Sequence, residues 1–160
     1  MKIKQQNINK SLLILLSLSF FVRAVLAMII EFGNDEVYYW TYAMYPDWSH
    51  FDHPPMVGWL IQLFSCNLLF DSEFFLRLSS IIFMTINTYL IFLIGKQVKN
   101  EQTGFYAALL YTASIYAFVI TGIFILPDTP LSIFTLLAVL QFVKYFQYEK
   151  NKHLLLAGLF

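Results

Sequence analysis

The sequence has little charge and almost no cysteine. Only 12% of its 160 residues are charged, against about 25% in an ordinary soluble domain, while 59% are hydrophobic and 19% aromatic. So few polar groups cannot cover the surface of a soluble globule, and a chain this apolar is not disordered either. The single Cys66 excludes an internal disulfide framework and a cysteine-based zinc site, and a net charge of +0 excludes a strongly basic nucleic-acid binder. The sequence therefore predicts an integral membrane protein whose partners include lipids and no nucleic acid.

The sequence contains several long apolar stretches with few or no charged residues. A membrane-spanning helix needs about 20 mostly apolar residues. Four stretches are predicted to span: residues 11–32, 74–95, 104–126 and 131–146. A fifth run, 154–160, is too short to span, so we expect these residues to be the N-terminal part of a longer protein. The predicted fold is an all-α, polytopic membrane helix bundle without a second domain inside residues 1–160.

The first apolar run has a second interpretation. Basic residues precede it, and Val25 and Ala27 offer small side chains at the spacing of a signal-peptide cleavage site. Arg23 interrupts the apolar region, however, and residues 28–30 continue it, which favours an uncleaved anchor. Both interpretations send residue 33 to the same side of the membrane.

The two signs of charge lie at opposite ends of the predicted spans. Eight of the 10 basic residues fall on one side: Lys2, Lys4, Lys10, Lys96, Lys99, Lys144, Lys150 and Lys152. Eight of the 10 acidic residues fall on the other: Glu31, Asp35, Glu36, Asp47, Asp52, Asp71, Glu73 and Asp128. Basic loops stay in the cytoplasm. We therefore predict a protein of the cytoplasmic (inner) membrane with a cytoplasmic N-terminus and an outer loop at 33–73.

The outer loop begins with a predicted short helix. Gly33 ends the first span, Asn34 can cap a new helix, and Pro46 ends that helix. Asp35 and Glu36 occupy its first turn, where the helix dipole favours negative charge. Stabilisation of the helix start would be enough to explain why two carboxylates occur there. One face of the helix carries a carboxylate and three tyrosines: Asp35, Tyr38, Tyr39 and Tyr42. Tyrosines at a membrane surface also serve as anchors.

The second half of the loop contains an Asp-His-Pro-Pro motif that begins at Asp52. The apolar run that follows, 56–70, is too short to span and predicts a second helix lying in the membrane interface. We assign no cofactor to the chain. If a divalent metal takes part, His50, Asp52 and His53 are its candidate ligands.

Three further charged residues are functional candidates. Arg23 and Arg77 are the only arginines and the only basic residues in the outer half. Arg23 can snorkel toward water or hold a phosphate. Asp128 lies in a Pro-Asp-Thr-Pro turn, where it can cap the next helix or face the same outer cavity as Asp35.

Taken together, these motifs resemble the integral-membrane glycosyltransferases of the GT-C superfamily. The resemblance rests on Asp35-Glu36 with Tyr38-Tyr39, on Asp-His-Pro-Pro, and on the Pro-Asp-Thr-Pro turn. It is closest to the bacterial branch related to dolichyl-phosphate-mannose protein mannosyltransferases, which includes the lipid A aminoarabinose transferase of lipopolysaccharide modification. The resemblance implies transfer of a sugar from a polyprenyl-phosphate donor to a lipid, glycan or protein acceptor at the outer face, with inversion.

The resemblance also implies roles for individual residues. The implied catalytic residues are Asp35 as base or orienting carboxylate, Glu36 as its support, and Asp128 as a second acid. The implied substrate-binding residues are Tyr38, Tyr39, His53, Pro54, Arg23 and Arg77. Two other functions stay open: a transporter or flippase fragment for lipid-linked sugars, and a non-catalytic subunit of a cell-envelope assembly. We expect residues 1–160 alone to be inactive.

Overall fold

The computed structural model describes residues 5–160, so Lys2 and Lys4 lie outside the described residues. Every regular element in that range is a helix, which confirms the predicted all-α class. The α-helices are α1 (Gln5–Ile29), α2 (Asn34–Met44), α3 (Met56–Phe64), α4 (Glu73–Val98), α5 (Glu101–Ala113), α6 (Asp128–Tyr148) and α7 (Asn151–Leu159). A short π-helix, η1 (Tyr116–Ile120), lies between α5 and α6.

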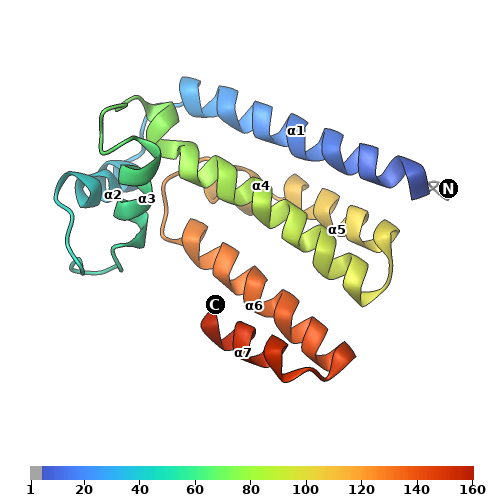
Figure 1. Ribbon diagram of the computed structural model, residues 1–160. Coiled ribbons are helices and arrows are strands. Elements are labelled where there is room, and N and C mark those ends of the chain that lie inside the picture. The colour runs from blue at the N-terminus through green and yellow to red at the C-terminus, as the bar shows by residue number, and fades with distance from the viewer. Residues whose placement is uncertain (1–4) are drawn as a thin grey trace.

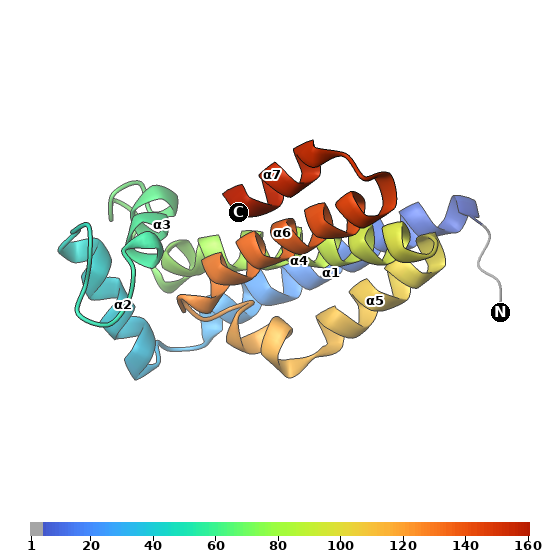
Figure 2. The same ribbon diagram turned by 90° about the horizontal axis from the view of Figure 1, so that it is seen from below.

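Three helices of the described chain are long and apolar enough to cross a membrane: α1, α4 and α6. They coincide with the first, second and fourth predicted spans, and Figure 1 shows them side by side with α4 in the middle. Figure 2 shows α5 on one side of this layer and α7 on the other. The chain is therefore a multi-pass membrane helix bundle.

The third predicted span, 104–126, is not one helix. Helix α5 ends at Ala113, Ser114 is extended (ψ 136°), and the π-helix η1 follows before irregular chain leads into α6. The Ser114 hydroxyl accepts the Ala117 N–H at 3.1 Å, so a side chain replaces a backbone acceptor and opens the helix. The prediction of a continuous helix is wrong, although the segment still runs the length of the bundle (Figure 2).

The α5 helix lies against α4 because both carry glycine at their crossing. A Cβ on Gly104 would lie 2.4 Å from the Phe92 carbonyl oxygen, and a Cβ on Gly95 would lie 2.7 Å from the Gly104 Cα. The two backbones therefore touch, as small residues allow between membrane helices.

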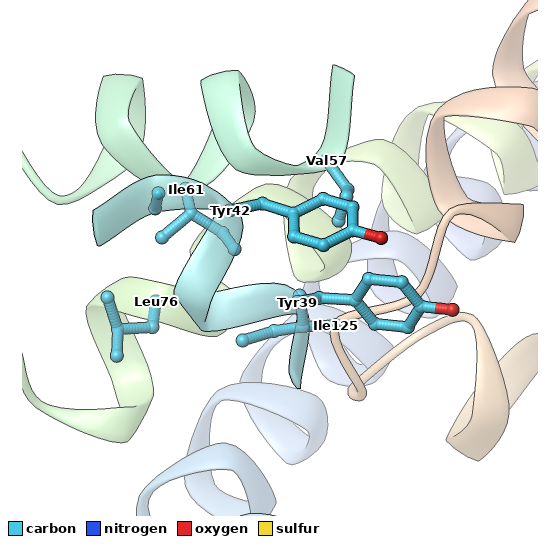
Figure 3. Close-up of a cluster of buried hydrophobic side chains, with 7 residues drawn as sticks. Tyr39, Tyr42, Val57, Ile61, Leu76 and Ile125 are labelled. Carbon is cyan, nitrogen blue, oxygen red and sulfur yellow. The ribbon is translucent and has the colours of Figure 1, made fainter. Parts of the chain in front are cut away.

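Helices α2 and α3 pack across one end of the bundle, which we call the α2–α3 end (Figure 1). Both occupy predicted positions, but α3 ends at Phe64 and not at residue 70. A buried cluster fixes them there, and Figure 3 shows its members Tyr39, Tyr42, Val57, Ile61, Leu76 and Ile125. The cluster joins α2 and α3 to α4 and to the segment before α6, so it holds the two tyrosines firmly in place.

Charge separates along the bundle as the sequence predicts. The acidic residues around α2 and α3, and those at the starts of α4 and α6, lie at the α2–α3 end. The lysines that follow α4 and α6 lie at the opposite end. Which of the two ends faces the cytoplasm stays a prediction.

Candidate functional site

A buried ion pair lies at the α2–α3 end. The Arg77 Nη2 group donates to Glu36 Oε2 at 2.6 Å, and Nε donates to Oε1 at 2.8 Å. The two residues are 0% and 2% exposed. This two-point geometry is the strongest form of an arginine–carboxylate contact, and it joins α2 to α4.

The remaining N–H groups of Arg77 hold the end of α1. Nη1 donates to the carbonyl oxygens of Ala27 (3.0 Å) and Ile30 (2.5 Å), and Nη2 donates to that of Glu31 (3.1 Å). A helix end leaves such carbonyls without backbone partners. All five guanidinium N–H groups are therefore engaged. This corrects the expectation that Arg77 contacts a substrate phosphate, because no donor is left for one.

Glu36 also accepts two backbone N–H groups. Gly33 donates to Oε2 at 3.1 Å, which caps the start of α2, and Ile125 donates to Oε1 at 3.0 Å. The carboxylate thus ties the start of α2 to the turn before α6. Glu36 thus accepts four hydrogen bonds, an arrangement that suits a positioning role, and its catalytic role stays a prediction.

The two other predicted acids border separate hollows. Asp35 is exposed and lines a pocket of about 510 Å³ between the end of α1 and the segment with Ile120 and Phe124. Asp128 lines a second pocket of about 270 Å³ and accepts a hydrogen bond from the Tyr116 hydroxyl at 2.9 Å. Its side chain does not cap α6. The two acids lie at the same end of the bundle, but they do not share one pocket in the described chain.

Tyr39 connects these acids electrostatically. Burial raises the pKa of its hydroxyl, and the negative charges of Asp52, Asp35 and Asp128 raise it further. Figure 3 shows that Tyr39 and Tyr42 direct their hydroxyls the same way, away from the apolar cluster around Leu76. Tyr39 therefore lies within electrostatic reach of both predicted catalytic acids.

Asp52 is held by tyrosines of α2. The Tyr42 and Tyr38 hydroxyls donate to Asp52 Oδ1 at 2.5 and 2.8 Å. Both hydrogen bonds lower the pKa of the Asp52 carboxyl, and the bond from Tyr42 has the larger effect. Burial and the hydrogen bond to Asp52 raise the pKa of Tyr42, so this phenol stays protonated. The tyrosine face of α2 thus binds the Asp-His-Pro-Pro loop.

The candidate metal ligands do not converge. His50 stacks on the Tyr42 ring, with centroids 3.6 Å apart and planes at 12°. His53 approaches Asp52 at 3.8 Å and contacts the ring of Tyr39. Residues 5–160 contain no group of three or more His, Cys, Asp or Glu side chains placed to hold a metal ion. The structure therefore does not assemble His50, Asp52 and His53 into a metal site.

Pro54 shapes another hollow. It lines a pocket of about 190 Å³ together with Val57 of α3 and with Pro127, Pro130 and Phe134 at the start of α6. This wall is almost wholly apolar. A substrate-binding role for Pro54 stays a prediction.

Arg23 is buried in α1 without a hydrogen-bond partner. It is 0% exposed, and none of its three guanidinium nitrogens has a partner in the part of the chain that the structure describes. Its guanidinium lies 4.8 Å from the centre of the Phe118 ring in η1. A side chain this enclosed does not snorkel to water, which corrects that expectation. It leaves an unneutralised cation roughly 9 Å below the end of α1, at 1.5 Å per residue.

The comparisons with known proteins decide the family. The family model of dolichyl-phosphate-mannose-protein mannosyltransferases matches residues 52–160, which include the Asp-His-Pro-Pro motif and the turn with Asp128. The chain belongs to this family. The mannosyltransferase family is of the GT-C type and implies mannosyltransferase-like glycosyl transfer by a membrane protein. No curated protein and no solved structure matches the chain.

The sequence did not predict three features of the candidate site. These features are the ion pair between Glu36 and Arg77, the hydrogen bonds from the tyrosines of α2 to Asp52, and the burial of Arg23 without a hydrogen-bond partner. The first two features join residues whose distance along the chain gives no periodic signal, and the third is the lack of a hydrogen-bond partner for Arg23 within residues 5–160. The one available signal was an arginine inside an apolar span, since such a residue needs a partner or a function.

Proposed function

We propose that this family member moves a sugar from a polyprenyl-phosphate donor to an acceptor at the outer face of the cytoplasmic membrane, with inversion. The observation that carries the proposal is the hydrogen bond from the Ile125 N–H to Glu36. Because Asp35 adjoins Glu36 and Asp128 follows Ile125 closely, this contact brings the two candidate acids to one end of the bundle.

Asp35 has the properties of a general base. It is exposed at the wall of the larger of the two pockets, where a substrate in the pocket can meet its carboxylate. In the proposed step an acceptor oxygen bonds to the anomeric carbon while the bond from that carbon to the donor phosphate oxygen breaks. Asp35 takes the proton of the acceptor, and the lipid phosphate leaves. One displacement of this kind inverts the anomeric configuration.

The pocket beside Asp128 suits the donor sugar. Five of its eight lining residues carry a hydroxyl group: Tyr111, Tyr116, Thr121, Ser132 and Thr135. Tyr111 is also close enough to Arg23 for an electrostatic interaction. Arg23 is therefore the proposed contact for the donor phosphate, and a phosphate beside it would neutralise its buried charge.

The test is Asp35→Asn in the full-length protein. We expect membranes with this variant to contain a normal amount of inserted protein and to lose sugar transfer by about 10²- to 10⁴-fold, the usual contribution of a general base. Asp71→Asn, an exposed carboxylate at the same end of the bundle, is the matched control and should transfer normally. Transfer at the unaltered rate by Asp35→Asn would refute the catalytic role.

A transporter or flippase for lipid-linked sugars is the second candidate. The break in the third segment and the buried Arg23 favour it, because transporters use interrupted helices and ionisable residues inside the membrane. Vesicles containing the purified protein and a fluorescent lipid-linked sugar separate the two functions. A transporter moves the donor across the bilayer without acceptor, whereas the transferase consumes donor only when acceptor is added.

A further inference from the structure

A groove lined by two tryptophans lies outside the pockets described so far. Pro46, Asp47, Trp48 and Trp59 border an open groove of about 500 Å³, within the range of about 300–1,000 Å³ typical of small-molecule sites. Pro46, Asp47 and Trp48 come from the loop after α2, and Trp59 comes from α3. Three of the four precede residue 52, where the family match begins, so the match assigns them no role.

The indole rings leave flat apolar surface open. Their centroids are 5.4 Å apart and their planes meet at 88°, so one ring packs with its edge against the face of the other. Trp48 is 83% exposed and Trp59 is 37% exposed. An indole that makes one edge contact and stays this open presents at least one free face to the groove.

A carboxylate lies beside these faces. Asp47 Oδ1 accepts the Trp48 backbone N–H at 2.7 Å, which fixes the loop and leaves Oδ2 to accept a hydrogen bond from a ligand. Asp47 is the only charged residue in the lining. The groove therefore repels an anion, and the donor phosphate does not belong there.

The position of the loop argues against a simple membrane anchor. Figure 1 shows the loop between α2 and α3 at the extreme α2–α3 end, beyond the ends of the long helices α1 and α4. Anchoring tryptophans lie level with the ends of the spans, where their rings meet the headgroups. A groove farther out along the bundle is placed to meet a ligand from water or from the outermost headgroups.

We propose that this groove is a carbohydrate subsite that holds a sugar ring of the acceptor. The apolar C–H face of a pyranose fits a tryptophan face, and its hydroxyl groups donate to a carboxylate such as Asp47. The inference rests on the proposed glycosyl transfer and adds the acceptor class, which is a sugar-bearing molecule. The groove binds and positions the acceptor, and it takes no part in bond breaking.

Tryptophan fluorescence tests the groove without relying on activity. Residues 1–160 contain three tryptophans, Trp40, Trp48 and Trp59, so single substitutions assign the signal to the groove. We expect the full-length protein in detergent to show a saturable fluorescence change with at least one methyl glycoside of mannose, glucose, galactose or N-acetylglucosamine. Trp48→Ala should abolish the change, and Trp40→Phe should keep it, because Trp40 lies outside the groove.

Kinetics separate this inference from the proposed function. With a glycan acceptor, Trp48→Ala should raise the acceptor KM about tenfold with little change in kcat. Asp35→Asn should lose kcat and keep the fluorescence change. If Asp35→Asn transfers sugar normally, only the catalytic role of Asp35 fails. If the wild type consumes no lipid-linked sugar in the presence of acceptor, the proposed function fails, while a retained fluorescence change leaves the sugar subsite standing.

Three results would overturn the subsite. The first is no fluorescence response to any of the four glycosides. The second is quenching of Trp48 by brominated lipids without a response to sugar, which would make it a membrane anchor. The third is a response to tetramethylammonium but not to sugar, since aromatic rings beside a carboxylate also suit a cation.

Discussion

Arg77 and Arg23 are both fully buried, yet their surroundings are opposite. Arg77 directs all five N–H groups at a carboxylate and at the last carbonyls of α1. Arg23 has an aromatic ring beside it and no hydrogen-bond partner within residues 5–160. Both residues lie in long apolar helices, and nothing in the adjacent sequence separates the two cases.

The difference shows what each residue contributes. Burying a charge is costly unless hydrogen bonds and an opposite charge offset the loss of water. Arg77 has that compensation from its own chain, so its role is to hold α1, α2 and α4 together. Arg23 does not, so in the proposed function its compensation comes from the donor phosphate.

The largest expected effect is that of Arg77→Met. The substitution leaves Glu36 buried without its cation and frees the last carbonyls of α1, so we expect a loss of about 3–5 kcal/mol in stability. Thermal unfolding in detergent measures it, with Arg23→Met as the control. Equal destabilisation by the two variants would remove the contrast between the two arginines.

Arg23→Met should leave stability unchanged or raise it, because an apolar side chain replaces an uncompensated charge. We expect the substitution to impair sugar transfer instead, by raising the KM for the lipid-linked donor about tenfold or more. Transfer assays at varied donor concentration check this. An unchanged donor KM would show that Arg23 does not contact the phosphate.

Gly122→Ala sharpens the contrast by disturbing the surroundings of Arg23. The new Cβ would lie 2.4 Å from the Phe118 carbonyl oxygen and 2.9 Å from Arg23 Nε. We expect a loss of about 1–3 kcal/mol from overpacking, together with a higher donor KM. Gly158→Ala, with no atom within 4 Å of its Cβ, is the matched control for both measurements.

The smallest expected effect is that of Asp52→Asn, at an exposed cluster. Because the tyrosine hydrogen bonds lower the folded-state pKa of Asp52, its contribution is present above the unfolded pKa of about 3.9 and disappears as pH falls through the lower folded value. Wild type should therefore melt higher than the variant at pH 7, and the gap should close in strong acid. A gap independent of pH would contradict this account.

The helices were easier to predict from the sequence than the side-chain contacts between them. It placed α1, α4 and α6 because long apolar runs are read directly along the chain. It missed the break at Ser114, since one side-chain hydrogen bond redirects the backbone there. Asp35 is a candidate catalytic residue through the family resemblance, and it is exposed in the folded chain. The resemblance also implies a catalytic role for Glu36 and a substrate contact for Arg77, and the structure engages these two residues in an ion pair.

By itself, the sequence determined that this protein is a multi-pass helix bundle with its two signs of charge at opposite ends. Those properties sum over many residues, so no single contact alters them. The tertiary structure decided which arginine is neutralised, how Glu36 ties the two acidic segments together, and where two tryptophans form a groove. These outcomes depend on a few hydrogen bonds and ring contacts between segments up to 89 residues apart, whose geometry exists only in the folded chain.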